Sequence, residues 1–267
     1  MAGVTLQLYT VDAFTDVPFK GNPAAICPLP SDVNLDDDIL QKIAVEMNLS
    51  DTAFIKLLHK SDSFKESNTF GLRWFTPKDE VKLCGHATLA SAAVLFGKLD
   101  NKHDRIVFKT LSGDLIVQRE GQSIHMDFPV GTTVKEDQSQ HEQIVASLGD
   151  VSGISDIVYC DSLRYLLVRL HDGWSRGPPG DGYQSDGGAP YDFVSRCFVP
   201  WGNIPEDPVT GSAQTVLAHY WAQQLGKNDF FTRQCSARGG EIVVKLRGDR
   251  VELLGKAAFV MDGVMKL

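Results

Sequence analysis

Residues 112–128 read SGDLIVQREGQSIHMDF, and residues 239–255 read GGEIVVKLRGDRVELLG. A gapless alignment of the two stretches matches Gly121 with Gly248 and places an apolar run before each of these glycines. Apolar runs rich in β-branched residues and separated by a glycine turn are typical of paired strands. The chain therefore carries an internal duplication, which predicts two similar lobes that face each other.

The duplication continues upstream of these strands. Arg73-Trp-Phe-Thr-Pro77 is matched by Arg196-Cys-Phe-Val-Pro200, and Gly85-His-Ala87 is matched by Gly211-Ser-Ala213. Each glycine of the second pair opens a helix-like stretch. Ligand sites favour the space between lobes, so we expect the two helix starts to face one small volume.

Length and composition narrow the class of protein. A chain of 267 residues can bury a large core in two domains. Its net charge is −8 and its lysines and arginines are not clustered, which argues against a nucleic-acid partner. Five scattered cysteines fit free thiols in a reducing compartment. The N-terminal residues lack a secretory signal pattern and the apolar run 87–96 is too short to span a bilayer, so we expect a cytoplasmic protein without a membrane partner.

Hydrophobic periodicity predicts strands and helices in both halves, each with one helix followed by three strands at its end. Strands are expected at 4–14, 24–27, 52–58, 70–75, 105–109, 113–119 and 123–128, and again at 156–160, 163–170, 230–234, 240–246 and 250–254. Helices are expected at 35–47, 86–97, 139–149 and 212–225. The helix at 86–97 is apolar nearly all round, which places it inside a rolled sheet. Residues 171–190 are so rich in glycine and proline that we expect a surface loop there.

Glu46 is the first candidate for proton transfer. At 100° per residue it lies close to Ile39 and Ile43 on the flank of the apolar stripe of helix 35–47. Partial burial there would raise the pKa of its carboxyl toward the range useful for acid–base catalysis. The alternative is an exposed helix glutamate. The polar turn Asn48–Thr52 is expected to end this helix and to line a pocket.

Cys84, Gly85 and His86 form the second candidate. A glycine before a helix lets the backbone approach a ligand, and the free N–H groups there bind anions. We expect His86 to donate to a carboxylate or a developing enolate, unless it is only a buried structural histidine. A helix start also lowers the pKa of a cysteine thiol, which would make Cys84 reactive.

The third candidate is the segment from Pro205 to Ala213. Asp207 is fixed between two prolines, Gly211 repeats the close approach of Gly85, and Ser212 is a good helix cap. An ordinary capping loop is the alternative. The sequence has none of the motifs for nucleotide or metal binding, and its seven histidines lack metal-ligand spacing. We therefore expect an acid–base enzyme without a cofactor or metal.

Five motifs together resemble the PhzF family of phenazine-biosynthesis isomerases, and among its branches the animal one. They are Asp12-Ala-Phe14, Gly21-Asn-Pro23, Glu46-Met-Asn-Leu-Ser50, Cys84-Gly-His86 and Glu206-Asp-Pro-Val-Thr-Gly-Ser212. The resemblance covers nearly the whole chain. It implies an α+β fold of the diaminopimelate epimerase type, with two pseudo-symmetric lobes that each roll an antiparallel sheet around a central helix. We expect residues 1–118, rejoined by 258–267, to form the first lobe and residues 119–257 the second.

The resemblance also implies a reaction. Glu46 would carry a proton across a small carboxylated substrate between the lobes, with His86, Asp207 and Ser212 around it. We expect further substrate contacts from Gly85, Gly211, Asn22 and Thr210. No cofactor or metal is implied. A homodimer and a WD-repeat protein are the expected protein partners.

Two other readings compete with this isomerase. Related racemases use two opposed cysteines, and Cys84 occupies the first of those positions, but the second holds Thr210. An epimerase or racemase that depends on Cys84 is therefore disfavoured. The other reading is a non-catalytic binding protein on an isomerase scaffold. The family usually supplies a helix and a strand where residues 171–190 stand. Either the second lobe lacks one sheet element or the chain is an alternative product.

Overall fold

The computed structural model describes residues 3–147, 153–171, 190–200 and 204–267. The predicted loop at 171–190 lies almost wholly outside these residues. The first half contains β1 (Thr5–Ala13), β2 (Asn22–Leu29), α1 (Asp37–Met47), β3 (Asp51–Lys56), β4 (Thr69–Phe75), β5 (Glu80–Val81), α2 (Gly85–Gly97), β6 (Arg105–Thr110) and β7 (Gly113–Glu120). The second half contains β8 (Ser123–Pro129), β9 (Val134–Lys135), the 3-10 helix η1 (Gln138–His141), α3 (Glu142–Ser147), β10 (Ile154–Cys160), β11 (Tyr165–Leu170), β12 (Phe193–Ser195), β13 (Cys197–Val199), β14 (Ile204–Asp207), α4 (Gly211–Leu225), β15 (Asp229–Gln234), β16 (Gly240–Arg247), β17 (Arg250–Gly255) and β18 (Ala257–Lys266).

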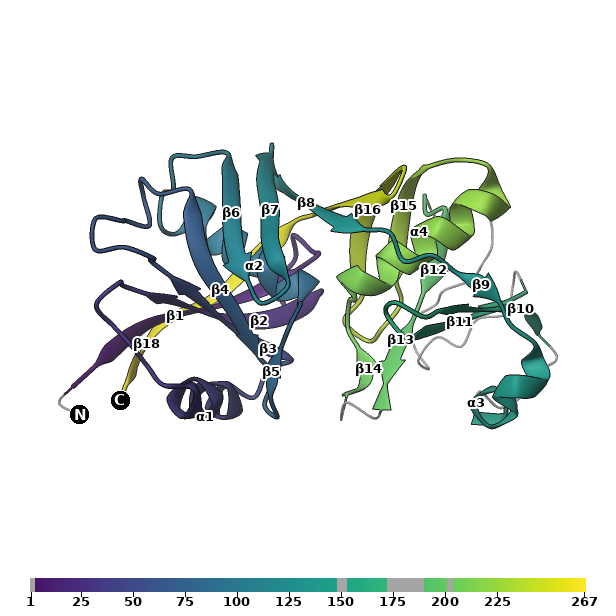
Figure 1. Cartoon of the computed structure of the whole chain (residues 1–267), viewed down its shortest axis with the longest axis horizontal. Helices are drawn as coiled ribbons and strands as arrows, with labels where there is room; N and C mark the ends of the chain where they lie inside the picture. Colours follow the sequence, from purple (N-terminus) through teal and green to yellow (C-terminus); the bar gives the residue numbers. More distant parts are fainter. Residues whose placement is uncertain (1–2, 148–152, 172–189, 201–203) are drawn as a thin grey trace.

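Two lobes lie side by side and share one long sheet (Figure 1). Its strands run in the order β12-β15-β16-β17-β8-β7-β6-β4-β3-β2-β1-β18, with β5 attached to β4. Most neighbours are antiparallel, while the pairs β2–β3, β4–β6 and β12–β15 are parallel. Strands β9, β10 and β11 form a smaller sheet in the second lobe, and β13 pairs with β14.

The repeated sequence forms the centre of the long sheet. The two copies are the hairpins β7–β8 and β16–β17, and β8 pairs antiparallel with β17 from Ile124 to Pro129. This arrangement gives the molecule an approximate twofold relation about the β8–β17 pair. The duplication that the sequence predicts is confirmed.

The repeated Arg-x-Phe-x-Pro segments also match in structure. Arg73 holds Glu80 with two hydrogen bonds of 2.7 Å, and Arg196 holds Glu206 with bonds of 2.6 and 2.8 Å. Each guanidinium also lies 5.0 Å from the ring centroid of the phenylalanine two positions later in the chain. Each pair joins two antiparallel strands, β4 to β5 and β13 to β14.

Helix α2 is the core of the first lobe. It is buried from His86 to Leu95 and touches β1, β2, β3, β7, β8 and β18, so the sheet wraps around it. Helix α4 packs against β16, β17 and β11 in the second lobe. The two central helices that the sequence predicts are confirmed within one residue at each start. One continuous apolar cluster extends from α2 into the second lobe at Val209 and Leu253.

Helix α1 covers the outer face of the first lobe. Leu40, Ile43 and Ala44 bury its apolar stripe in a second apolar cluster with Phe54 and Phe75. Its N-cap is Asp36, whose carboxylate accepts from the Ile39 N–H at 2.9 Å. Asn48 ends the helix in a left-handed conformation (φ 49°), as the predicted polar turn requires.

Loops from both lobes meet at the motif Asp12-Ala-Phe14. The Asp12 carboxylate accepts from Arg238 at 2.6 Å and is 1% exposed. The Phe14 carbonyl accepts from the Glu241 N–H at 3.0 Å, and the Gly21 N–H donates to the carbonyl of Gly239 at 2.7 Å. These contacts join the β1–β2 turn to the loop between β15 and β16, which fixes the lobes against each other.

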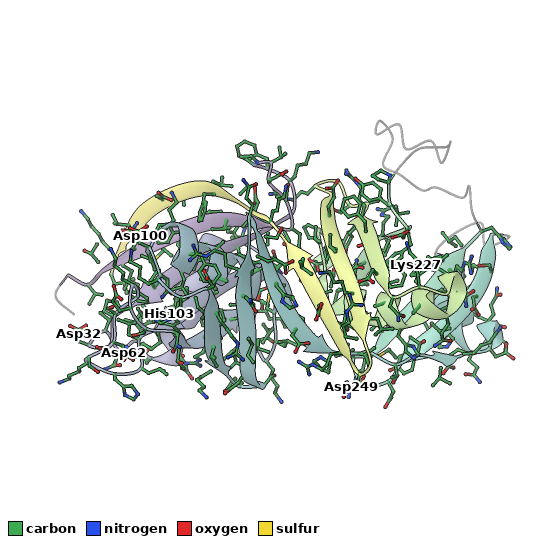
Figure 2. All side chains as sticks on the ribbon, turned by 90° about the horizontal axis from the view of Figure 1, so that it is seen from above. Asp32, Asp62, Asp100, His103, Lys227 and Asp249 are labelled. Carbon is green, nitrogen blue, oxygen red and sulfur yellow. The ribbon has the colours of Figure 1, made fainter. Side chains whose placement is uncertain are left out.

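The sequence analysis expected residues 258–267 to rejoin the first lobe but did not predict the strand that they form. This strand, β18, leaves the second lobe after β17 and pairs with β1 along the first (Figure 1). Short strands β5, β9, β12, β13 and β14 were also missed. Charged side chains lie on the periphery, among them Asp32 and Asp100 on the first lobe and Asp249 at the β16–β17 turn (Figure 2). Among the described residues, no helix has both the length and the apolar character that crossing a membrane demands.

Candidate functional site

The starts of α2 and α4 meet at the junction of the lobes. A side-chain carbon added at Gly85 would lie 3.5 Å from the Cα of Gly211. Cys84 and Thr210 are the N-caps, and neither side chain makes a capping hydrogen bond. Ser212 lies inside α4, so its predicted capping role is wrong. The two helix starts therefore face each other as expected.

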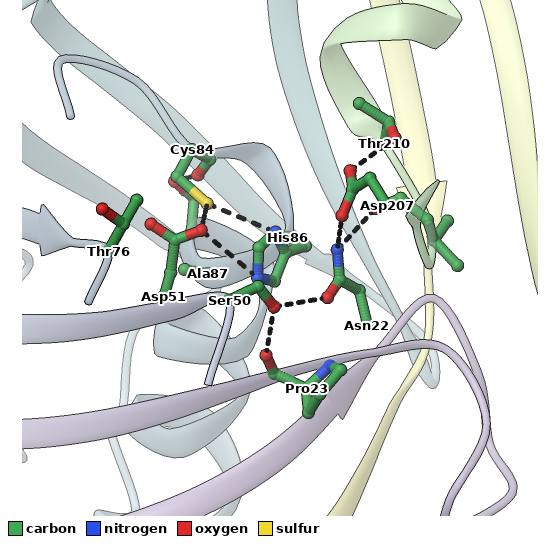
Figure 3. Close-up of polar contacts among 12 residues, drawn as sticks. Asn22, Pro23, Ser50, Asp51, Thr76, Cys84, His86, Ala87, Asp207 and Thr210 are labelled. Atoms are coloured by element: carbon green, nitrogen blue, oxygen red, sulfur yellow. Dashed lines mark hydrogen bonds and ion pairs between the residues drawn. The ribbon is translucent and has the colours of Figure 1, made fainter. Parts of the chain in front are cut away.

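Three polar side chains cluster beside the start of α2 (Figure 3). The Cys84 thiol lies 3.2 Å from Oδ2 of Asp51 and 3.3 Å from Nδ1 of His86. Nε2 of His86 lies 3.6 Å from the same Asp51 oxygen. Asp51 comes from the first residue of β3, and all three side chains are buried.

Burial sets the protonation of this cluster. Burial, with a smaller contribution from the nearby Asp207, raises the pKa of Asp51 to about 7 against the opposing effect of the hydrogen bond from Cys84. Burial lowers the pKa of His86 to about 3, so the ring is neutral at neutral pH. Burial and the Asp51 charge raise the pKa of the Cys84 thiol well above its ordinary value. The predicted lowering of that pKa is wrong, because desolvation outweighs the helix start.

Asp207 faces this cluster from the second lobe. Its Oδ1 accepts from the Asn22 amide at 2.8 Å, and its Oδ2 accepts from the Thr210 hydroxyl. Gln234 donates to the Asp207 carbonyl at 2.7 Å and accepts from the Thr210 N–H at 2.9 Å. Burial raises the pKa of Asp207, although both side-chain bonds oppose that shift. A carboxyl group with fixed orientation and a raised pKa suits proton transfer.

Asn22 is fully buried and connects the two lobes. Its amide also donates to the Val209 carbonyl at 2.9 Å, and its oxygen accepts from the Ser50 hydroxyl at 2.8 Å. Gly21 precedes it with φ 64°, and an added side-chain carbon there would lie 2.1 Å from the Ala13 carbonyl. With both amide hydrogens engaged, Asn22 orients Asp207, a role that differs from the direct substrate contact expected from the sequence.

Ser212 also lies at the junction, in the first turn of α4. Its hydroxyl lies 2.9 Å from the hydroxyl of Tyr165 on β11. Burial raises the pKa of Tyr165 to about 12, so its phenol stays protonated and can donate. Thr210 occupies the position that holds the second catalytic cysteine in related racemases. Its hydroxyl donates to the Asp207 carboxylate.

Glu46 lies apart from this buried network. Its side chain is exposed in the last turn of α1, so the predicted desolvation is wrong for this structure. The buried stripe centres on Leu40, Ile43 and Ala44, and Glu46 projects roughly 110° away from that centre at 100° per residue. Glu46 is nevertheless close in sequence to the junction of the lobes. A short turn after α1 leads from Asn48 to Ser50 and Asp51, which lie at that junction.

Sequence reasoning missed Asp51, Tyr165 and Gln234. The position of Asp51 in the turn Asn48–Thr52, directly after a motif residue, was a usable signal. Tyr165 and Gln234 sit in ordinary strands and carry no local signal. Within the described part of the chain, Asp51, Cys84 and His86 also form a group whose donor atoms, one from each side chain, lie within 4.8 Å of one another and could hold a metal ion.

Comparisons with known proteins bear on the family and the fold of the chain. The family model of phenazine biosynthesis-like proteins (PhzC-PhzF) matches residues 11–175 and 181–263. A phenazine biosynthesis-like domain-containing protein from Rattus norvegicus is 46% identical, over 97% of this chain and 99% of the relative. An uncharacterised isomerase from Pseudomonas aeruginosa is 44% identical, over 98% and 99%.

A solved structure shows the same fold. The crystal structure of a putative phenazine biosynthesis PhzC/PhzF protein from Clostridium difficile superposes on this chain with a TM-score of 0.80 at 34% sequence identity. The match covers 98% of this chain and 100% of that one. The α+β fold of the diaminopimelate epimerase type, with two pseudo-symmetric lobes, is confirmed.

Proposed function

The chain belongs to the PhzC/PhzF family of phenazine biosynthesis-like proteins, and on that premise we propose that it is a cofactor-independent isomerase that moves a proton within a small carboxylated substrate. The family and its relatives support an isomerase scaffold. The observation that carries the proposal is the meeting of two helix starts at Gly85 and Gly211, between the buried His86 and Asp207.

The helix starts supply the binding energy for an anion. The first N–H groups of a helix have no intrahelical partner, and the helix dipole places partial positive charge there. Two such ends at Gly85 and Gly211 favour a carboxylate, and they also favour the negative charge that develops when a carbon next to it loses a proton. Glycine at both positions lets the two helix starts approach closely, since an added side-chain carbon at either would lie 3.5 or 3.7 Å from the Cα of the other.

The surrounding side chains divide the acid–base work. Because His86 is neutral, it can hydrogen-bond a developing oxyanion without holding that oxyanion as tightly as a charged imidazolium would. Asp207, whose pKa is raised by burial, can exchange a proton with the substrate. By resemblance, Glu46 carries the transferred proton, and this role requires the bound substrate to draw its exposed side chain to the junction. Asp51 is the buried carboxyl that would carry the proton if Glu46 does not.

Cys84 is not assigned a proton-transfer role. A thiol whose pKa is raised well above its ordinary value supplies little thiolate at neutral pH. Its counterpart at the start of α4 is Thr210, which has no thiol. A two-thiol epimerase mechanism is therefore disfavoured on both sides of the junction.

Solvent-deuterium exchange into a panel of small carboxylic acids tests the proposal. We expect at least one acid to exchange with the wild-type protein, and His86→Gln, Asp207→Asn and Glu46→Gln to lower its exchange at least about 100-fold. Glu142→Gln, an exposed glutamate in α3, is the matched control for Glu46 and should leave exchange unchanged.

Two outcomes would change the assignment. Exchange that survives Glu46→Gln but is lost in Asp51→Asn would transfer the proton-carrying role to Asp51. Acids that bind the protein without exchange in the wild type would favour a binding protein on an isomerase scaffold.

A further inference from the structure

The cluster beside the start of α2 combines three kinds of metal ligand. Asp51 offers a carboxylate, Cys84 a thiolate once its proton leaves, and His86 an imidazole (Figure 3). Their exposed fractions are 7%, 8% and 6%. We propose that these three side chains bind a thiophilic divalent cation, with Zn²⁺ as the reference ion.

The spacing of the donor atoms fits a small coordination sphere. Tetrahedral zinc sites with ligand distances of about 2.0–2.3 Å have polyhedron edges of about 3.3–3.8 Å. The Cys84 sulfur lies 3.2 Å from Oδ2 of Asp51, and that oxygen lies 3.6 Å from Nε2 of His86. The sulfur also lies 3.3 Å from the other ring nitrogen of His86, Nδ1, and one donor atom from each side chain lies within 4.8 Å of the other two. Side-chain movements on this scale would bring three ligands around one ion and leave a fourth position open.

Two buried atoms of the cluster point independently to a ligand. Nε2 of His86 and Oδ1 of Asp51 make no hydrogen bond within the described part of the chain. A buried polar atom without a partner is destabilising, so most buried polar atoms have one. An ion bound by His86 through Nε2 would give this nitrogen a partner. Rotation of the Asp51 carboxylate about the ion would bring Oδ1 into contact with the ion as well.

Charge balance favours a divalent ion with an affinity for sulfur. One thiolate, one carboxylate and one neutral imidazole neutralise two positive charges, so the occupied buried site carries no net charge. Binding releases the thiol proton of Cys84, and any proton on Asp51, to solvent. The sulfur and nitrogen ligands select Zn²⁺ over Mg²⁺ or Ca²⁺, which prefer oxygen alone.

An ion at this position would act on the proposed catalytic site. His86 cannot serve both the ion and a developing oxyanion, so occupancy should inhibit proton exchange. This consequence rests on the proposed function, whereas the ion site itself does not.

Cobalt spectroscopy tests the site without any substrate. The EDTA-treated full chain is titrated with Co²⁺, and we expect a thiolate-to-cobalt charge-transfer band in the near ultraviolet together with the visible bands of tetrahedral Co²⁺. Equimolar Zn²⁺ should abolish both. Cys84→Ser should remove the charge-transfer band, and Asp51→Asn and His86→Gln should weaken binding at least about 10-fold. Cys235→Ser, a half-buried thiol in the second lobe, is the matched control and should keep the band.

X-ray absorption of the Zn²⁺-loaded wild type covers the case in which the variants do not fold. We expect one sulfur at about 2.3 Å and nitrogen or oxygen ligands at about 2.0–2.1 Å. Absence of sulfur, more than one sulfur, or a charge-transfer band that survives Cys84→Ser would overturn the proposal. A bound ion that leaves deuterium exchange unaffected would uphold the ion site and count against the role of His86 in exchange.

Discussion

At the start of α2 the Cys84 thiol donates to Asp51, and at the start of α4 the Thr210 hydroxyl donates to Asp207. The two lobes thus repeat one arrangement, a capping residue that hydrogen-bonds a buried carboxyl group. They differ in the second carboxylate oxygen. Asn22 reaches across the junction to Asp207, whereas Oδ1 of Asp51 has no partner among the described residues. The comparison teaches that a duplicated scaffold can hold both oxygens of one buried carboxyl group and leave one oxygen of the other without a partner among the described residues.

The first prediction removes the residue that makes the two carboxyl groups different. Asn22→Ala leaves Asp207, the Val209 carbonyl and the Ser50 hydroxyl without a shared partner. We expect the free energy of unfolding to fall by about 3–5 kcal/mol, measured by urea denaturation. Ser50→Ala removes one bond of the same network and should cost about 1 kcal/mol. A loss below about 1 kcal/mol for Asn22→Ala would show that Asp207 does not depend on the contact.

The second prediction concerns the pH dependence of Asp51, measured with EDTA present. The folded protein holds a proton with a pKa of about 7, while the unfolded chain releases it near 3.8. The folded state therefore binds more protons between these values, and this group makes stability fall as the pH rises. We expect a contribution of about 1.4 kcal/mol per pH unit between pH 5 and 6.

Asp51→Asn should remove that contribution, so the variant gains stability over the wild type as the pH rises. The opposite slope from His86, whose pKa is lowered, is present in both proteins and cancels in the difference. Asp249→Asn, at an exposed hairpin tip, controls for the loss of one carboxylate. A constant difference between Asp51→Asn and wild type from pH 4 to 8 would contradict the prediction.

The third prediction compares the two Arg–Glu pairs that the duplication repeats. Arg73 with Glu80 and Arg196 with Glu206 have the same two-bond geometry and similar partial exposure. Double-mutant cycles should give coupling energies of about 0.5–1 kcal/mol for each pair, equal within about 0.5 kcal/mol. A coupling above about 2 kcal/mol in only one lobe would show that the structural repeat is not an energetic one.

The fourth prediction has the smallest effect on stability. Gly85→Ala and Gly211→Ala place a methyl group 3.5 and 3.4 Å from its nearest neighbours, which are ordinary contact distances. Each should change the free energy of unfolding by less than about 0.5 kcal/mol, because alanine also favours the helix. Both should nevertheless lower deuterium exchange, since each methyl group stands between the two helix starts, 3.5 or 3.7 Å from the Cα of the other glycine, and displaces their N–H groups. Unchanged exchange in both variants would remove the helix starts from the site.

The sequence predicted the fold better than the chemistry of the site. The repeated hairpins and the all-apolar helix 86–97 report directly on burial, so both lobes and their central helices were predictable. Asp51 and Glu46 show the limit. One is a polar residue in a turn and the other flanks an apolar stripe, yet the first is buried and the second exposed. Local periodicity does not show which turn becomes buried at the junction of the lobes. That burial is what raises the pKa of Asp51.

Strand β18 has a consequence for synthesis of the chain. Its register joins Thr5 to Lys266, so β1 acquires this neighbour about 250 residues after it leaves the ribosome. At translation rates of about 5–20 residues per second, the edge of β1 stays open for roughly 10–50 s. An unpaired strand edge is a template for pairing with other chains. The first lobe therefore completes its sheet only after the strands of the second lobe have been made.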